Sequence, residues 1–468
     1  MPSAASGVFA WVAVRMQRAE AGRAGECLPL DFLTVRRGAI GVAGRLESWG
    51  ALQWSRRSRG WHSRLPRARA QMSMNMGGPA ATLKQNVLRH DGSGTSLEPG
   101  SSAPPMLMRM SGQWMEMLHG QAEAAEQQQT GLRGRDKLFS VNWAMLMAQR
   151  RTSRRQWTLV SMFSLEPATI TGRYYPELFQ QGETAFGKPI VDGQHPHNLF
   201  MALAAIYDQD LGERGLITLY AAPVGDPALG PVAYPHRASA ESDPLAPLVH
   251  HLQDSTHIAY DVLTVGLTYG PVRVETSGFH GREPGENRWT IYQGAVDSWS
   301  TRLTAAPARD WLAQYSIGHL HEPEALHPEE DVLRQTASVG AHHAWTAAEL
   351  EATAIWGRNH TIGTDVNANG YLVEADARLR ARQSIWTRIE NADRTTDLLG
   401  AAAPAEEIVA GRVQAYTGGY AHRIWHSDWS AVELGAQVTL YNTPPRLVSL
   451  YGEHPAGVAG VLHWRIGR

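Results

Sequence analysis

The chain of 468 residues has a single cysteine, Cys27, and no apolar run long enough for a membrane-spanning helix. Its longest uninterrupted apolar stretch extends from Leu199 to Tyr207, far below the roughly 18 residues that such a helix requires. Without further cysteines, the rest of the chain has no disulfide or thiolate metal site. A helical membrane protein is therefore excluded, whereas a transmembrane β-barrel is not, because every second residue of a barrel strand is polar.

The N-terminal part lacks a legible secretion signal and differs in composition from the rest. Residues 1–70 contain 12 arginines and only four acidic residues. We expect residues 1–71 to be an Arg-rich disordered segment, either a natural basic tail or the product of a start codon placed too early. We favour the second interpretation, since a barrel needs an export signal. Residues 72–105, rich in Met, Gly, Ser and Pro, are predicted to be a disordered leader.

One segment shows the period of a strand with unusual clarity. From Tyr371 to Arg382, charged residues occupy the even positions from Glu374 onward, and Val373, Leu379 and three alanines lie between them. A strand sends successive side chains to opposite faces, so one face is ionic and the other is apolar. This pattern is typical of a barrel wall between lipid and a wet lumen.

The same alternation recurs along the chain. It predicts about sixteen strands, with a range of about 14 to 18, from residue 106 to the C-terminus. The predicted strands start near residues 107, 138, 157, 199, 215, 260, 272, 296, 310, 333, 348, 370, 384, 409, 429 and 457. Connectors after even-numbered strands are short, and those after odd-numbered strands are long, notably residues 166–197 and 223–257. This alternation indicates an all-β, transmembrane, antiparallel up-and-down barrel with short periplasmic turns and long extracellular loops.

Aromatic composition agrees with a membrane location. The chain has 16 Trp and 14 Tyr but only 8 Phe, a preference for rings that settle at the interface between lipid and water. Many of them stand near predicted strand ends, including Trp157, Tyr220, Tyr269, Trp386 and Tyr441.

The long loops carry the most distinctive strings of the sequence. They are residues Gln181 to Asn198, Ala222 to Pro231, Tyr234 to Arg237, His250 to His257 and Phe279 to Trp289. In these strings the chain resembles an uncharacterised family of bacterial outer-membrane, porin-like β-barrel proteins, over most of residues 72 to 468. The resemblance implies an integral barrel in the outer membrane of a Gram-negative bacterium, and no particular chemistry.

Charged residues of the predicted strands should line the lumen. The cations are Arg109, Arg273, Arg302, Arg334, Arg378, Arg380, Arg382, Arg388, Arg412 and Arg465, and the anions are Glu275, Glu374, Asp376, Glu390 and Glu433. An excess of arginine in an aqueous channel of about sixteen strands favours anions. The alternative is that these charges neutralise one another across strands and only stabilise the wall.

Loops of this length are expected to fold across the mouth of the barrel and constrict it. The candidate constriction residues are Asp192, His195, His197, Asp226, His236, Arg237, His250, Asp254, His257, His280, Arg282 and Glu283. Two other functions remain open. His250, Asp254 and His257 would share one helical face and could bind Zn or Cu. Asp254, Ser255 and His257 contain the residue types of a hydrolase triad, without the usual Gly-x-Ser-x-Gly motif.

The sequence therefore predicts a porin-like channel for small polar or anionic solutes, constricted by residues 166–197 and 223–257. The alternatives are a metal-handling barrel that uses the loop histidines and an outer-membrane hydrolase. We expect no enzyme activity and no cofactor, apart from Zn or Cu in the metal alternative. The expected partners are outer-membrane lipid and small polar solutes. Nucleic acid is not expected, and a homotrimer is left open.

Overall fold

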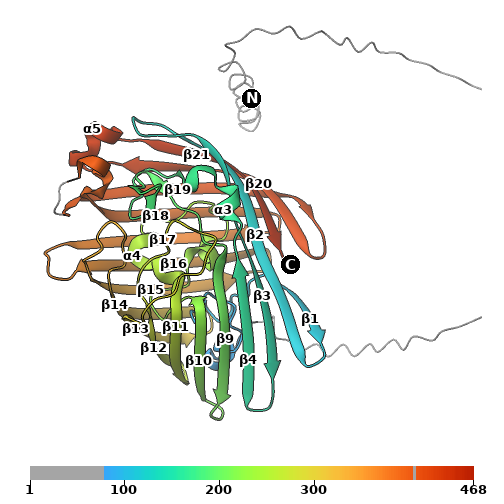
Figure 1. The fold of residues 1–468 in the computed structure, drawn as a ribbon. Coiled ribbons are helices and arrows are strands. Elements are labelled where there is room, and N and C mark those ends of the chain that lie inside the picture. Colours follow the sequence, from blue (N-terminus) through green and yellow to red (C-terminus); the bar gives the residue numbers. More distant parts are fainter. Residues whose placement is uncertain (1–78, 404–406, 468) are drawn as a thin grey trace, which may run out of the picture. The chain divides into compact units, whose positions relative to one another are not determined.

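The computed structural model describes residues 79–403 and 407–467, and most of their regular structure is strand. Sixteen strands pair antiparallel with their neighbours in the chain, and the sheet closes where β21 (Ala456–Ile466) pairs with β2 (Trp114–Gln129). The result is a closed 16-stranded β-barrel (Figure 1), which confirms the predicted fold class. The predicted segment 1–71 lies outside the described residues.

The wall strands follow one another in chain order around the barrel. Between β2 and β21 they are β3 (Lys137–Arg151), β4 (Arg155–Phe163), β9 (Phe200–Asp210), β10 (Gly215–Gly225), β11 (Ala259–Tyr269), β12 (Val272–His280), β13 (Ser298–Ala308), β14 (Trp311–Leu320), β15 (Val332–Ala344), β16 (Ala348–Thr361), β17 (Asn367–Leu379), β18 (Gln383–Thr395), β19 (Val409–His426) and β20 (Ser430–Asn442). All of these were predicted to within about three residues of their start.

The first predicted strand was wrong in its extent. A turn at Gly112, whose φ is 62°, ends the short β1 (Leu107–Ser111) and begins the long β2. Strand β1 pairs only with the first residues of β2, and β21 takes the same edge of β2 further along. The first wall strand is therefore β2, and β1 extends the sheet at one rim.

The two rims differ as the sequence predicts. One rim has short turns, at residues 152–154, 211–214, 270–271, 309–310, 345–347, 380–382 and 427–429. The other rim carries long loops, of which residues 164–199 and 226–258 are the longest. The loops contain α3 (Glu166–Thr169), η1 (Thr171–Arg173), β5 (Tyr175–Pro176) paired with β8 (Gly193–Gln194), β6 (Thr184–Ala185) paired with β7 (Lys188–Pro189), η2 (Tyr234–His236), η3 (Ala238–Ala240), α4 (His250–Gln253), η4 (Ser255–His257), η5 (Thr396–Ala402), η6 (Pro445–Leu447) and α5 (Val448–Tyr451).

Strand β17 shows how the alternation separates the two faces of the wall. Glu374 and Asp376 are 1% and 2% exposed and face the interior, whereas Tyr371 and Val373 are 43% and 55% exposed on the outside. The exposed apolar side chains continue around the barrel, for example Leu263, Val265 and Leu267 on β11, Val272 and Val274 on β12, Ile385 and Ile389 on β18, and Val458 and Leu462 on β21. Such a continuous apolar belt outside a polar interior is the arrangement that lipid requires.

Two of the predicted interface aromatics, Trp157 and Tyr269, lie in this outer surface. Tyr220, Trp386 and Tyr441 are exceptions, since they face inward and are at most 4% exposed. No helix among the described residues is long and apolar enough to cross a membrane.

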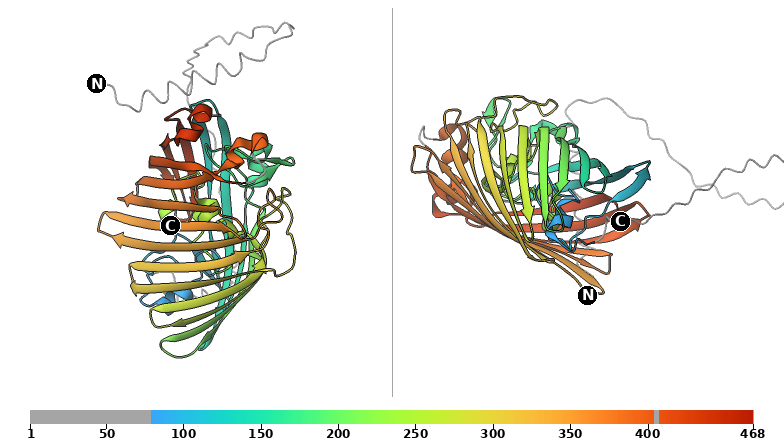
Figure 2. Two further views of the ribbon diagram at one scale, coloured as in Figure 1. Left: turned by 90° about the vertical axis from the view of Figure 1, so that its left-hand side faces the viewer. Right: turned by 90° about the horizontal axis from the view of Figure 1, so that it is seen from below.

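The described part of the predicted disordered leader is ordered, which corrects that prediction. Residues 79–105 contain α2 (Leu83–Val87), whose N-cap Thr82 accepts a hydrogen bond from the Gln85 N–H. Leu83, Val87 and neighbouring leucines pack against Leu216 of β10 and Leu312 of β14, both of which face inward. This segment therefore lies in the lumen, where apolar burial stabilises it (Figure 2).

Candidate functional site

The centre of the lumen is filled by the loop between β10 and β11, residues 226–258, which we call the insert. The insert carries η2, η3, α4 and η4, and α4 lies within the barrel in Figure 1. Leu248 and Val249 pack against Ile355 of β16 and Leu372 of β17. The predicted loop between residues 223 and 257 thus lies inside the barrel and fills it more completely than a constriction would.

Glycines of the wall make room for the insert. A Cβ atom at Gly370 of β17 would lie 2.9 Å from Val249 Cγ1, and one at Gly318 of β14 would lie 3.0 Å from Leu229 Cδ2. These separations are shorter than ordinary contacts, so the wall needs residues without side chains at these points.

Arginines of the wall hold the insert through its backbone carbonyls. Arg302 Nη1 donates to Gly230 O at 3.2 Å, Arg388 Nη1 donates to Leu245 O at 2.8 Å, and Arg334 Nη2 donates to His251 O at 2.8 Å. Arg394 similarly donates to the carbonyl of Leu248. The insert has little regular secondary structure to satisfy its buried carbonyls, and the five guanidinium donors of an arginine can do so.

Arg237 connects the insert to the wall by charge. Its side chain is 1% exposed, and its Nε lies 2.5 Å from Glu374 Oε1 while its Nη1 lies 2.9 Å from Asp254 Oδ2. Arg388 binds the other oxygen of Glu374 at 3.0 Å and also binds Asp243 of the insert at 3.0 Å. Two wall residues and three insert residues therefore form one buried ionic network. Burying these charges costs hydration free energy, which the close ion pairs of the network must offset.

Most of the predicted lumen charges face inward and are paired. Glu275 binds Arg273 at 2.9 Å and Arg302 at 3.0 Å. Other inward pairs join Arg378 to Glu241, Arg423 to Glu433, and Arg465 to both Glu241 and Glu433. Asp376 and Glu390 are also buried on the inner face, and Glu390 accepts a hydrogen bond from the Val249 N–H. This arrangement favours mutual neutralisation of the charges over a ring of free cations.

Four predicted lumen arginines are placed elsewhere. Two of them are exposed, namely Arg109 on β1 and Arg382 in the turn after β17. Arg412 of β19 pairs with Asp393 at 2.7 Å and lies over the ring of the outward-facing Tyr371, with 44% of its side chain exposed. Arg380 follows the end of β17 in a turn, where its φ is 50°. Period-two counting fails for Arg380 because the strand ends at Leu379, and for Arg412 because a bulge between β18 and β19 shifts the register.

The predicted metal set His250, Asp254 and His257 is close in space but is used internally. His250 Nδ1 lies 2.7 Å from Asp254 Oδ1, and the other carboxylate oxygen of Asp254 binds Arg237 and the Tyr234 N–H. His257 Nδ1 lies 2.8 Å from the Asp254 backbone carbonyl oxygen. Burial alone would raise the pKa of Asp254, but His250 and Arg237 hold it well below its ordinary value. The Asp254 carboxylate is therefore a structural anion and not an available metal ligand.

The hydrolase alternative is not assembled in the form predicted. Ser255 Oγ accepts a hydrogen bond from Arg334 Nη1 at 2.8 Å, and the Asp254 carboxylate is directed to His250 and Arg237. A serine nucleophile requires a histidine base within hydrogen-bonding distance, itself oriented by an acid. No such chain connects Asp254, Ser255 and His257.

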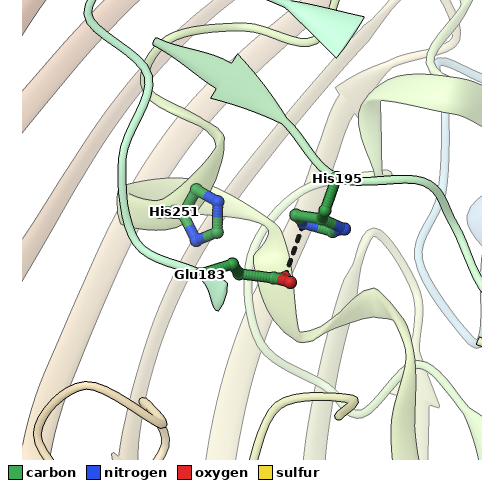
Figure 3. A group of neighbouring side chains, drawn as sticks. All are labelled: Glu183, His195 and His251. Atoms are coloured by element: carbon green, nitrogen blue, oxygen red, sulfur yellow. Dashed lines mark ion pairs between the residues drawn. The ribbon is translucent and has the colours of Figure 1, made fainter. Parts of the chain in front are cut away.

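A different group converges at the rim with long loops. Ligand atoms of Glu183, His195 and His251 all lie within 4.8 Å of one another, and the three buried side chains face one common point (Figure 3). His195 Nε2 lies 2.6 Å from Glu183 Oε1, and Arg288 binds the other oxygen of Glu183. Burial lowers the pKa of His195 well below its ordinary value, so its imidazole is neutral, which is the form that binds metals.

The remaining candidate constriction residues are distributed over this rim and the insert. Asp192 accepts from the Phe179 N–H and pairs with Arg133, and His197 is held by Glu166. His280 contacts Asp297, Arg282 pairs with Glu322 at the surface, and Glu283 lies 3.8 Å from His251. Asp226 and His236 lie on the other side of the insert and line a small cavity beside β4 and β9.

Sequence reasoning missed Glu183 and His251 as partners of His195. All three residues stand in the distinctive loop strings, but they are separated by up to 68 positions and no period relates them. It also missed three inward-facing side chains, namely His119 of β2, Met145 of β3 and Met162 of β4. The alternating pattern in these segments predicted strands, but it did not predict that these side chains meet.

No protein-family model matches the chain, and no curated protein is significantly similar to it in sequence. Solved structures do resemble it. An anion-selective porin from Comamonas acidovorans is 11% identical with a TM-score of 0.47, and the match covers 75% of this chain and 99% of the porin. OmpF of Salmonella typhi and OprB of Pseudomonas putida are each 10% identical with TM-scores of 0.44, over 76% of this chain and 100% and 94% of theirs. At this identity the likeness concerns the barrel fold and carries nothing about a substrate.

Proposed function

We propose that the protein is an integral β-barrel of the bacterial outer membrane that acts as a gated passage for small polar solutes, with the insert as the gate. The observation that carries the proposal is that the outer and inner faces of the barrel wall differ in polarity. An apolar belt covers the outside of the wall, while the inner face is polar and charged and is covered by residues 79–105 and the insert instead of by a second sheet. A soluble protein would not expose such a belt.

The closed lumen makes gating part of this function. The insert and residues 79–105 occupy the interior, where the cavities lined by Glu98 and by Asp226 have volumes of only about 60 and 20 Å³. A larger cavity of about 340 Å³, lined by Glu183 and His280, lies at the rim with long loops. A solute can therefore pass only when the insert moves. Many contacts of the insert with the wall are hydrogen bonds and ion pairs, which water can replace in an open state.

Glu98 provides a pH-dependent test of this gate. Its carboxylate accepts a hydrogen bond from the Ala238 N–H at 3.0 Å, which joins residues 79–105 to the insert. Burial raises the pKa of Glu98 to about 7, with Asp91 and Glu374 raising it further and Arg237 opposing them. Glu351 of β16 lines the same cavity as Glu98.

The closed state should loosen as the pH rises. A released Glu98 has an ordinary pKa near 4.3, so between about pH 4.5 and 7 the closed state binds a proton that the open state does not, and stability of the closed state falls across this window. In planar bilayers we expect the open probability to rise roughly tenfold or more from pH 5 to pH 8. Glu98→Gln, which mimics the protonated acid, should flatten this response.

The two parts of the proposal give separable results. Inserted barrels that never open between pH 5 and 8, in the wild type or with the insert released, would eliminate the channel function. Openings that are equally frequent at all pH values would leave the channel and reject Glu98 as its sensor.

We propose a second candidate function, metal handling at the rim, on the specific convergence of Glu183, His195 and His251. Two imidazoles and a carboxylate suit Zn²⁺ in a tetrahedral site with one open position. The carboxylates of both this set and the predicted set of His250, Asp254 and His257 already have partners. This set differs in that the ligand atoms of all three side chains lie close to one another and His251 Nδ1 is buried without a hydrogen-bond partner.

Titration calorimetry of the detergent-solubilised barrel at pH 7.5 tests the zinc site. We expect one Zn²⁺ per chain and a loss of affinity of at least roughly tenfold in His195→Gln, because even partners outside the ligand shell contribute 10- to 100-fold. His280→Gln is the matched control, since His280 contacts Asp297 outside the cluster. Equal affinities for His195→Gln and the wild type would reject the site.

A further inference from the structure

Methionine is distributed very unevenly in this barrel. Nine methionines lie in the described residues, namely Met106, Met108, Met110, Met115, Met117, Met145, Met147, Met162 and Met201, and none follows Met201. They are therefore confined to β1, β2, β3, β4, β9 and the approach to β1, and the strands from β10 to β21 have none. A flexible apolar residue used only as core filler has no reason to avoid the other twelve strands of the wall.

The strand register brings these side chains together in pairs. Met110 is opposite Met115 and Met108 is opposite Met117 across β1 and β2, and Met117 is opposite Met147 across β2 and β3. Directly opposite residues on one face of an antiparallel pair have Cβ atoms about 5 Å apart. A band of thioethers thus extends from the rim with short turns into the lumen.

Histidines meet this band at its inner end. His119 of β2 is opposite Met145 of β3, and Met145 is opposite Met162 of β4. His236 of the insert reaches the same point, with its Nε2 atom 2.8 Å from Met162 Sδ. Its ring stacks on Trp143 at 4.2 Å and lies 6.0 Å from the ring of His119.

A cavity of about 20 Å³ lies against this group and is lined by Met145, Met162, Met201, His236 and His257. Asp226 and Tyr220 lie at its edge. The volume suits one water molecule or one ion. The Nε2 atoms of His119 and His257 are buried without a hydrogen-bond partner, in side chains that are 3% and 7% exposed overall. Unpaired buried nitrogens are costly, and apolar packing of methionines does not account for them.

We propose that this group is a binding site for Cu(I), with the thioethers of Met145 and Met162 and the imidazole of His236 as ligands and with Met201, His119 and His257 completing the surroundings. Thioether and neutral imidazole donors suit a soft monovalent cation and disfavour Mg²⁺ and Ca²⁺, which take oxygen ligands.

The site joins two parts of the molecule. Met145 and Met162 belong to the wall, whereas His236 and His257 belong to the insert. A bound ion would therefore fasten the insert to β3 and β4. Binding itself does not require that the barrel conducts, so the proposal stands apart from the channel function.

The test is anaerobic Cu(I) titration of the full chain in detergent against a coloured Cu(I) chelator. The decisive variant is Met145→Leu/Met162→Leu, because leucine conserves volume and cores usually tolerate such swaps. The matched control is Met108→Leu/Met110→Leu, two methionines of β1 that are 44% and 54% exposed. We expect one tightly held Cu(I) in the wild type and the control, and at least a hundredfold weaker retention in the decisive variant.

Two results would overturn the proposal. One is a wild-type chain that loses Cu(I) to the chelator, and the other is a decisive variant that retains Cu(I) like the wild type. X-ray absorption of the copper-loaded wild type keeps the test independent of any variant. Growth with selenomethionine should then replace sulfur by selenium in the first shell of the copper, and a first shell without selenium would also reject the site.

Discussion

Replacing Arg237 by methionine is expected to release the insert from the barrel wall. Arg237 joins Asp254 of the insert to Glu374 of β17 in a network that is almost fully buried. Methionine fills part of the volume but leaves two carboxylates without their shared cation, and breaking a buried pair in this way costs about 3–5 kcal/mol. By the relation of 1.4 kcal/mol per factor of ten, amide protection of the insert should fall roughly a hundred- to a few thousand-fold.

Hydrogen exchange of residues 226–258, measured by mass spectrometry on the folded barrel, gives this value directly. Arg282→Met is the matched control, because Arg282 and its partner Glu322 are 49% and 34% exposed, and a pair at the surface contributes only about 0–1 kcal/mol. Protection that is unchanged in Arg237→Met would show that wall glycines and apolar contacts hold the insert without this network. Exchange that increases equally in the wall strands would indicate global unfolding instead.

Removing the insert is expected to convert a closed barrel into an anion-selective pore that residues 79–105 still narrow. When residues 229–256 are replaced by a short Gly-Ser linker, Arg302, Arg334, Arg388 and Arg394 lose the carbonyls that they now bind. The same deletion removes the acidic residues Glu241, Asp243 and Asp254. Sixteen strands enclose a lumen wide enough for water, and the guanidinium donors that no longer bind the insert would attract anions.

Single-channel recordings with a salt gradient measure both the conductance and the preference for anions. We expect continuous conductance in the deletion variant against rare openings in the wild type, and a reversal potential with the sign for anions. Adding Arg388→Gln to the deletion variant should reduce the selectivity while the conductance persists. A deletion variant that assembles in the membrane and stays silent would contradict the insert as the gate, and a preference for cations would contradict the role of the arginines.

These two experiments also separate the interpretations of the arginine excess. The sequence leaves open whether the lumen arginines select anions or neutralise neighbouring acids. In the closed state Glu275, Glu374 and Glu433 each bind at least one arginine. Backbone carbonyls of the insert accept further hydrogen bonds that the wall arginines donate. Any anion preference is therefore expected only after the insert has left.

The sequence predicted those features of the structure that depend on residues close together along the chain. A strand has period two, so Glu374, Asp376 and Arg378 identify one face of β17 without knowledge of any neighbour, and lipid outside with water-compatible groups inside repeats this pattern around the wall. The short and long connectors then determine which ends of the strands share a rim. The rule fails at Gly112, at Arg380 and at Arg412, where a turn or a bulge interrupts the period.

The contents of the lumen depended on tertiary structure. Residues 79–105 read as a flexible leader because their Gly, Ser and Pro residues lack periodicity, yet Leu83 and Val87 find apolar partners on β10 and β14. Likewise, nothing in the loop strings relates Glu183 to His251, or His236 to Met162. Sequence by itself determined the barrel, because alternation is a property of neighbouring residues along one chain. Only the tertiary structure decided what fills the barrel and which side chains meet there, because those contacts join segments that no local period connects.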